Sequence, residues 1–496
     1  MKNASAPINH IPPEVLSLIP DYWGHRNAEK DTIALTHVCR GWREIFTSRP
    51  SLWTRLDCWN ADKTRVYIQR SRSLPLRITL REFYDTRYCD YALSTATPSL
   101  TRSESLTIFA CSPDTLVNLF NNLPFSDILK EVDIRFLDNT SNDYVIVPST
   151  IFPGHLSPLR KLTLSGVITH LPWRNLSNLS EFAFGCGDSL DIELFNMTNL
   201  LDFFESTPLL RKIVFHDLTL DSSTISPGRV VSLPNLERFT ANIFPALSTF
   251  FDHLSIPTRT SLSLAFSFPE GSHPIPVCLA NNFNDLHITT INLSVPLPYK
   301  GCMRLDGPSG RLRTYGGWGS WNEPTFFQSL CEFDLSHAQR LSVMAYMPQP
   351  QRKIKDSPIF QPLLSMNNLR TLTLIETDHT PFTRALNPAE NESNTVLCPA
   401  LEDLVLYVES LSSLAIEDLK KMASGRAKRF STLLSITIIG LGEAHPTKEV
   451  LSLREHVRRV EYKLEVSSPK WDAVFGDNRG DEDDQQYFYD IEGIYG

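Results

Sequence analysis

The stretch that comes nearest to a ligand-binding loop is the glycine-rich run GRLRTYGGWGSW, residues 310–321. Glycine-rich loops cradle phosphate through backbone N–H groups when the order G-x-x-x-x-G-K-[ST] adds a lysine and a hydroxyl. This run has neither that order nor a lysine beside its glycines. We therefore expect residues 307–321 to form a loop or insertion. Its aromatic side chains, Tyr315, Trp318 and Trp321, would either contact a partner or pack against the rest of the chain.

Side chains suited to nucleophilic or metal chemistry are scattered rather than grouped. The histidines, among them His25, His216 and His253, form no H-E-x-x-H and no zinc-type pairing with cysteine. The 9 cysteines include no C-x-x-C, and their odd number favours free thiols in a reducing compartment, the cytoplasm or nucleus. No G-x-S-x-G elbow is present. The sequence predicts no catalytic residues, no metal site and no cofactor, although a triad built from distant positions stays open.

The charge distribution limits the kinds of partner. The net charge is −9, and residues 471–496 hold eight acids and one base, so −7 lies there and −2 elsewhere. A body this close to neutral lacks the basic field that nucleic-acid binding requires. The segment 467–496 is expected to be an acidic tail, too charged to fold alone. One basic cluster is interpreted as a solvated helix face, or as a dock for an acidic partner or for that tail: Lys420, Lys421, Arg426, Lys428 and Arg429.

Length and hydrophobicity indicate a soluble globular chain with more than one core. It has 496 residues, of which 42% are hydrophobic. No run of about 18 apolar residues exists, so no membrane span is predicted. Residues 1–9 lack an apolar signal core and are expected to be a disordered tail.

Apolar spacing near the N-terminus predicts an amphipathic helix from residue 12. Val15, Leu16 and Ile19 follow in steps that place them on one helical face. Proline is well suited to the first turn, where its missing N–H is not needed, as in the pair at residues 12–13. Pro20 would remove a backbone hydrogen bond further along, so the helix is predicted to stop or kink near Ile19.

A second helix is predicted over Asp31–Phe46. It repeats the apolar spacing at Leu35, Val38 and Trp42, and Asp31 is a plausible N-cap. Arg49-Pro50 ends it, and Ser51-Leu52-Trp53 follows as an apolar hook. A piece of roughly 45 residues is too small to be stabilised by its own core, so we expect it to need a partner.

Three runs in this segment, IPPEVLSLI, ALTHVCRGWREI and PSLW, resemble the three parts of the F-box motif. They are most similar to F-box-like proteins expanded in mushroom-forming fungi, which usually have a large apolar residue where Pro20 stands. The resemblance implies a helical F-box over residues 10–57 that docks on the Skp adaptor, which links to a cullin. The adaptor-binding residues it implies are Ile11, Pro12, Pro13, Val15, Leu16, Ile19, Leu35, Val38, Cys39, Trp42, Leu52 and Trp53.

Residues 58–100 are predicted to link this segment to the rest of the chain. The run ADKTRVYIQRSRSLPLRITL, residues 61–80, also resembles the F-box-like family. Its alternation of charged and apolar residues predicts one short helix over Ala61–Arg72. Pro75 ends that helix, and Leu76–Leu80 is predicted to be the first strand.

A recurring pattern, an apolar residue at positions 1, 4 and 6, predicts a series of strands. Copies begin at residues 129, 159, 179, 210, 236, 369, 401, 433 and 457, with weaker copies at 288 and 338. The steps from 369 to 401 and from 401 to 433 are both 32 residues, near the leucine-rich-repeat period. The predicted fold is α/β: a small helical F-box, then an irregular leucine-rich-repeat solenoid over residues 101–466 with a curved parallel sheet. Pro381–Pro399 is expected to be a polar loop.

Strand alternation predicts which side chains of this array are buried. Leu372, Leu374, Leu404 and Leu406 should face the interior. The residues between such pairs should lie on the opposite, accessible face. That face is the candidate substrate-binding surface, and it comprises Thr163, Ala183, Val214, Thr373, Val405 and Thr437.

Two functional hypotheses of different classes remain. In the first, the chain is the substrate-recognition subunit of an SCF-type (Skp–cullin–F-box) E3 ubiquitin ligase: the F-box binds the Skp adaptor, and the solenoid holds a protein substrate. In the second, it is a leucine-rich-repeat scaffold or sequestering protein without a ligase role, an alternative kept open by Pro20. Both are non-enzymatic and involve neither nucleic acid nor membrane. The sequence does not identify the substrate.

Overall fold

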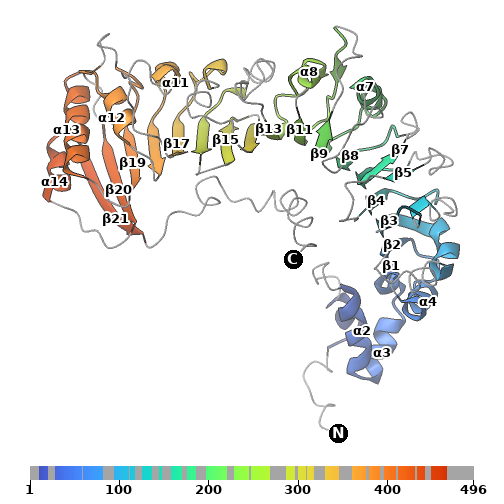
Figure 1. The fold of residues 1–496 in the computed structure, drawn as a ribbon. Coiled ribbons are helices and arrows are strands. Elements are labelled where there is room, and N and C mark those ends of the chain that lie inside the picture. Colours follow the sequence, from blue (N-terminus) through green and yellow to red (C-terminus); the bar gives the residue numbers. More distant parts are fainter. Residues whose placement is uncertain are drawn as a thin grey trace. The chain divides into compact units, whose positions relative to one another are not determined.

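The computed structural model divides into two compact units. The N-terminal unit comprises Met1–Leu236 and His253–Ser255, and the C-terminal unit comprises Glu237–Asp252 and Ile256–Gly496. Figure 1 labels many of the elements of both. The structure describes residues 11–19, 28–58, 60–81, 94–110, 112–114, 116–117, 126–136, 145–147, 158–169, 176–185, 197–219, 228–244, 247–267, 286–295, 300–308, 310–317, 330–345, 360–375, 379–390, 396–408, 412–429, 433–441 and 448–465. The predicted tails, 1–9 and 467–496, and Pro20, Trp318 and Trp321 lie outside these described residues.

The N-terminal unit begins with a helical segment, residues 11–58. Its elements are α1 (Pro13–Leu18), α2 (Ala28–Val38), α3 (Arg40–Thr47) and the 3-10 turn η4 (Pro50–Trp53). Helix α1 ends with Ile19 as its C-cap, which confirms the predicted stop near that residue.

The prediction of one helix over Asp31–Phe46 is wrong in two respects. It begins at Ala28, so Asp31 lies inside α2 and is not its N-cap. It is also broken at Cys39, whose backbone is extended, with φ −159° and ψ 175°. Cys39 instead caps α3, because its Sγ accepts a hydrogen bond from the Trp42 backbone N–H at 3.5 Å.

A sheet of parallel strands follows in the N-terminal unit. The strands pair in the order β1-β2-β3-β4-β6-β8-β9, all parallel. The predicted linker helix is confirmed as α4 (Ala61–Arg70), but Leu76–Leu80 is not the first strand, because β1 precedes it. The elements are β1 (Arg55–Asp57), β2 (Leu76–Arg81), η5 (Thr97–Arg102), β3 (Ser103–Ala110), β4 (Glu131–Phe136), β5 (Val145–Val147), β6 (Lys161–Ser165), β7 (Val167–Thr169), β8 (Glu181–Gly185), α7 (Met197–Ser206), β9 (Lys212–Thr219), β10 (Val231–Ser232) and β12 (Leu254–Ser255).

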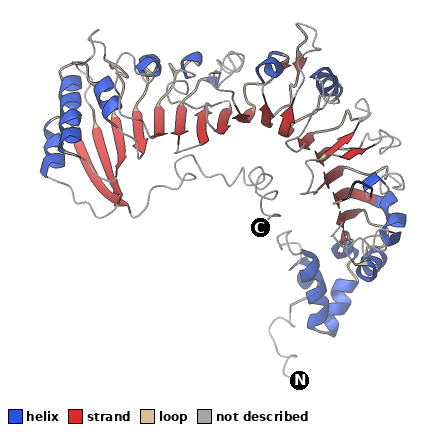
Figure 2. Cartoon of the chain, in the orientation of Figure 1, coloured by secondary structure: helices blue, strands red, loops and turns tan. Residues whose placement is uncertain are grey.

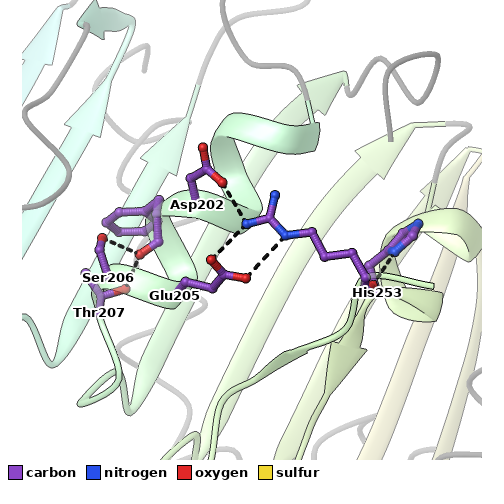
Figure 3. Close-up of polar contacts among 7 residues, drawn as sticks. Asp202, Glu205, Ser206, Thr207 and His253 are labelled. Atoms are coloured by element: carbon purple, nitrogen blue, oxygen red, sulfur yellow. Dashed lines mark hydrogen bonds and ion pairs between the residues drawn. The ribbon is translucent and has the colours of Figure 1, made fainter. Parts of the chain in front are cut away.

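Arg229 ties helix α7 to the small pair of strands β10 and β12. Its Nη2 lies 2.6 Å from Asp202 Oδ1 and 3.0 Å from Glu205 Oε2, both on α7 (Figure 3). Its carbonyl oxygen lies 2.6 Å from Nδ1 of the buried His253. A carbonyl only accepts, so Nδ1 carries the proton. These contacts fix the position of a helix whose other side packs on the sheet through Phe203 and neighbouring buried residues.

The C-terminal unit contains a second mostly parallel run of strands. Their order is β11-β13-β16-β15-β14-β17-β18-β19-β20-β21. Helices α11, α12 and α13 lie on one side of β17 to β21 (Figures 1 and 2). The elements are β11 (Arg238–Phe244), α8 (Leu247–Asp252), β13 (Ser261–Ser267), β14 (Thr290–Val295), β15 (Lys300–Asp306), β16 (Arg311–Gly317), η9 (Leu330–Glu332), β17 (Arg340–Ala345), α11 (Phe360–Ser365), β18 (Thr371–Ile375), α12 (Thr380–Leu386), β19 (Asp403–Val408), α13 (Ser413–Ala427), β20 (Ser435–Leu441), α14 (Lys448–Leu451), η11 (Ser452–Glu455) and β21 (Arg459–Glu465).

The glycine-rich segment predicted as a loop is instead part of this sheet. Strands β14, β15 and β16 form two antiparallel pairs in succession, and β16 also pairs in parallel with β13. The glycines allow close backbone approach at the β15–β16 turn. A Cβ on Gly307 would lie 2.1 Å from the Leu286 carbonyl oxygen, and one on Gly310 would lie 2.2 Å from that of Thr258. Glycine here serves packing of the turn.

Two further expectations for the C-terminal unit are also corrected. The predicted polar loop at residues 381–399 contains helix α12, whose Phe382 and Leu386 are fully buried. In the predicted solvated basic face, Arg426 is fully buried and donates through Nη1 and Nη2 to the carbonyls of Leu397 and Cys398, each at 2.8 Å. Burial lowers the pKa of Arg426 to about 10.

The strand pattern read from the sequence is confirmed. Each of the copies coincides with a strand, from β4 to β21, although β1, β3, β5, β7, β10, β12, β13, β15 and β16 were not predicted. The exposed fractions of Leu372, Leu374, Leu404 and Leu406 do not exceed 1%, as the alternation requires. No helix among the described residues is long and apolar enough to cross a membrane.

Candidate functional site

The helical segment is built around a small apolar cluster that draws on all three helices. Leu16 from α1, Leu35 from α2, and Trp42 and Phe46 from α3 are buried against one another. The Trp42 and Phe46 rings meet edge to face, with centroids 5.6 Å apart. Arg43 adds a polar link, because its Nε donates to the Thr36 carbonyl at 2.9 Å and so holds α3 against the end of α2.

Trp53 joins this cluster to the linker helix rather than to the surface. Its Nε1 donates to the Phe46 carbonyl at 3.0 Å, and its ring meets Tyr67 edge to face at 4.8 Å. The guanidinium of Arg70 covers the ring at 4.3 Å. Trp53 is 1% exposed, so it positions the helical segment and is not available to a partner.

The residues predicted to bind the adaptor fall into three groups by exposure. Leu16, Leu35, Trp42 and Trp53 are buried. Ile11, Ile19 and Leu52 are half-buried at the rim of the cluster. The exposed members are Pro12, Pro13, Val15, Val38 and Cys39.

The apolar side chains left in solvent form the candidate docking surface. Val15 is 51% exposed and Val38 55% exposed. Leu18, which the sequence analysis missed, is 46% exposed and lies three residues after Val15, so the two share one side of α1. The three-residue spacing from Val15 is the sequence feature that could have identified Leu18. These three residues, Val15, Leu18 and Val38, are named here the exposed apolar set.

A second candidate surface lies on the open face of the sheet in the C-terminal unit, the side that alternates with the buried leucines. Thr373, Val405 and Thr437 are aligned in register across β18, β19 and β20. All three are partly exposed, as predicted. Ser342 on β17 continues the row at one end.

The corresponding row in the N-terminal unit differs from expectation. Thr163, Ala183 and Val214 are aligned across β6, β8 and β9, but their exposed fractions are only 3%, 8% and 3%. The three side chains are aligned in register as the strand alternation predicts, but they are not accessible to a partner. These three residues are not an accessible contact surface.

The described residues offer no metal centre: they contain no group of three or more His, Cys, Asp and Glu that could hold an ion.

Comparison with known families gives a match at the N-terminus. Residues 8–59 match the F-box-like family, so this segment is an F-box-like domain. The match spans the helical segment with β1 and ends before α4. A search of curated proteins found no match to the chain.

Proposed function

We propose that this protein is the substrate-recognition subunit of an SCF-type ubiquitin ligase. The F-box-like domain at residues 8–59 carries the proposal, since domains of this family typically bind Skp adaptors. The cullin would be reached through the adaptor. The receptor itself performs no chemistry; it raises the concentration of substrate lysines near the conjugating enzyme. The corresponding location is the cytoplasm, the nucleus or both.

The exposed apolar set supports docking through this domain. The domain is too small to bury its apolar side chains, and half-exposed Val15, Leu18 and Val38 remain. Val15 and Leu18, three residues apart on α1, leave adjacent apolar area in solvent, and adjacent exposed apolar residues mark interaction sites more often than single ones do. An adaptor covering them would remove this surface from water. Buried Leu16 and Trp42 would then act indirectly, by holding α1 and α3 in place.

For the strands that follow, we propose an irregular leucine-rich-repeat solenoid whose open face holds a protein substrate. The regular 32-residue step, the buried leucines of β18 and β19 and the buried isoleucines of β20 support this assignment. Thr373, Val405 and Thr437 are the accessible candidates for contact. The buried row at Thr163, Ala183 and Val214 is left out of the surface.

Co-purification of the full chain with a Skp adaptor and cullin tests the ligase proposal. The variant Val15→Asp/Val38→Asp should lose the adaptor and keep its fold, since both side chains are about half exposed. The matched control is Leu414→Asp on α13, another exposed apolar position, 69% exposed, which should retain the adaptor. A double aspartate at Leu16 and Ile19 is less informative, because Leu16 is buried and its loss would unfold the domain.

The alternative is a scaffold or sequestering protein with the same solenoid and no ligase role. The shortness of α1, which stops at Leu18 ahead of Pro20, favours it. Absence of adaptor and cullin from the purified wild-type complex, with substrate still bound, would select this alternative. Unchanged adaptor binding by Val15→Asp/Val38→Asp would instead show that another face of the domain docks.

A further inference from the structure

Strand β21 is the last strand of the sheet in the C-terminal unit (Figure 1). It pairs in parallel with β20 along one side, from Arg459 opposite Ser435 to Glu465 opposite Leu441. No strand among the described residues pairs along its other side, which we call the outer edge of β21. Such an edge offers backbone N–H and C=O groups to a strand from another chain.

The hydrogen bonds toward β20 identify the residues that face the outer edge. The backbone N–H of Arg459 donates to the carbonyl of Leu434, just ahead of β20, at 3.0 Å. Successive residues of a strand direct their backbone groups to opposite sides, so alternate residues counted from Arg459 face β20. Val460 and Leu464 therefore direct their N–H and C=O groups away from β20 and toward the outer edge.

The side chains of β21 separate into an apolar side and a charged side. Val460 is aligned with the buried Ile436, and Leu464 is aligned with Gly440, so both lie on the side of the sheet that carries the buried residues. Val460 is 6% exposed, whereas Leu464 is 50% exposed and leaves apolar area uncovered on this last strand. The opposite side carries the charged residues Arg459, Glu461 and Lys463.

The charges of β21 are balanced within the strand. Glu461 pairs with Arg459, and Oε2 of Glu461 also lies 3.5 Å from Lys463 Nζ. The whole strand, RVEYKLE, has as many acids as bases and is neutral. The outer edge thus offers no surplus charge to a small ion, and what its backbone lacks is a second strand.

The order of charges along β21 matches a second copy of the same strand. In RVEYKLE, each charged position has an opposite charge at the same distance on the other side of Tyr462. A two-fold axis sets two identical edges antiparallel, so that each residue faces a counterpart and is faced by it. With the axis at Tyr462, Glu461 lies opposite Lys463 of the second copy, and Val460 lies opposite Leu464 of the second copy.

This register satisfies the backbone and both sides of the strand. Val460 and Leu464, whose backbone groups face the outer edge, would exchange hydrogen bonds across the axis. The half-exposed Leu464 would gain an apolar neighbour. Glu461 and Lys463 would form opposite-charge pairs twice, once on each side of the axis, and such cross-strand pairs stabilise a sheet.

The neighbouring registers are disfavoured by the same charges. Moving the axis to Glu461 would set Glu461 opposite its own copy and Arg459 opposite Lys463. Moving it to Lys463 would set Lys463 opposite its own copy. Like charges directly opposite each other are destabilising, so the charge order selects one register.

We propose that this protein forms a homodimer through antiparallel pairing of the outer edges of β21 from two copies, with Tyr462 at the two-fold axis. This inference goes beyond the proposed function and does not depend on it. Two short strands bury a small area, so the dimer is of the weak, concentration-dependent class. The assembly carries two F-box-like domains and two copies of each candidate binding surface, which allows bivalent binding.

Sedimentation velocity of the full chain from about 1 to 100 μM tests the dimer. Wild type should shift with concentration toward twice the mass of one chain. Leu464→Pro removes an N–H that faces the outer edge and none that faces β20, so it should keep the fold and weaken dimerisation by about tenfold or more. The matched control Leu464→Ala keeps that N–H and should dimerise more tightly than Leu464→Pro.

Charge reversal tests the register. Glu461→Lys and Lys463→Glu should each weaken self-association by about tenfold or more, because each sets like charges opposite each other twice. An equimolar mixture of the two variants should recover the dimer, since every lysine at these positions then lies opposite a glutamate. Lys421→Glu on α13, another exposed lysine, should dimerise like wild type.

The outcomes separate clearly. A wild-type chain that stays monomeric at about 100 μM would overturn the proposal, as would a dimer that both Leu464→Pro and the single charge reversals leave intact. A mixture of the two reversals that stays monomeric, with both thermal midpoints equal to wild type, would overturn the antiparallel register. Recovery of the dimer in the mixture shows that each variant is folded, so the result holds even if Leu464→Pro lowers the thermal midpoint.

Discussion

The F-box-like domain and the strands of the C-terminal unit bury their apolar residues to very different extents. In β18 and β19, the inward leucines are at most 1% exposed, and each is aligned with an apolar residue of the next strand. In the helical segment, Val15 and Val38 remain more than 50% exposed beside a cluster whose buried members, among the residues described, are Leu16, Leu35, Trp42 and Phe46. One region completes its core from its own neighbours, and the other leaves part of it uncovered.

This difference separates stability from recognition. A strand flanked on both sides gains its packing from the same chain, so its apolar residues report on folding. A segment of about 45 residues is too small to bury all its apolar residues, so mutation of the exposed ones should affect partner binding. Mutations in the two regions should therefore give different readouts, and the predictions below are ordered by expected effect.

The largest effect is expected for Leu404→Ala in β19. It removes a side chain that is 1% exposed and aligned with Leu372 and Ile436, so unfolding free energy should fall by about 2–5 kcal/mol. The adjacent Val405→Glu, on the open face, should cost less than about 1 kcal/mol. Urea denaturation of both variants measures the contrast. If Val405→Glu unfolded as readily as Leu404→Ala, the assigned faces of β19 would be wrong.

An intermediate effect is expected from adding one methyl group in each region. Gly310→Ala places a Cβ 2.2 Å from the Thr258 carbonyl oxygen, so it should destabilise the C-terminal unit by about 1–3 kcal/mol. Gly41→Ala in α3 meets nothing within 4 Å and should stabilise its helix by up to about 1 kcal/mol. Thermal melts of the two variants should shift in opposite directions. A stabilising Gly310→Ala would contradict the tight turn between β15 and β16.

The smallest change is chemical labelling, which leaves the fold intact. Cys39, at the break between α2 and α3, is exposed, whereas Cys398 is 1% exposed and burial raises its pKa to about 12. The thiolate is the reactive form, so iodoacetamide at pH 8 should modify Cys39 at least about a hundredfold faster. Peptide mass spectrometry resolves the two sites. In denaturant the rates should converge, and comparable rates in the native chain would refute the burial of Cys398.

The sequence predicted most strands because their apolar residues recur with a fixed spacing. Leu401, Leu404 and Leu406 illustrate a pattern that is local, and the structure places the last two in β19. What it missed depends on contacts between distant residues. Strand β16 is identified as a strand by its pairing with β13 and β15, and the glycines at residues 316–317 gave the appearance of a loop.

The candidate site was predicted only in outline, for a similar reason. Apolar spacing located the helices but did not separate buried Leu16 from exposed Val15, because the two residues are consecutive in α1 and both fit the apolar spacing. The break at Cys39 depends on a sulfur cap that no periodicity indicates. Likewise, alternation placed Thr163 in register with Ala183 but did not predict that it is only 3% exposed, because exposure depends on residues distant in the sequence.

The reversed order of β14, β15 and β16 has a consequence for the folding kinetics of the C-terminal unit. Strands β17 to β21 each pair with the strand next along the chain, so their contacts close short loops in sequence. Strand β13 instead pairs with β16, with β14 and β15 lying between them in the sequence. Because closing a longer loop costs more entropy, this step should lag behind zipping of β17 to β21. Hydrogen exchange pulsed during refolding should then protect amides of β18 and β19 before those of β13.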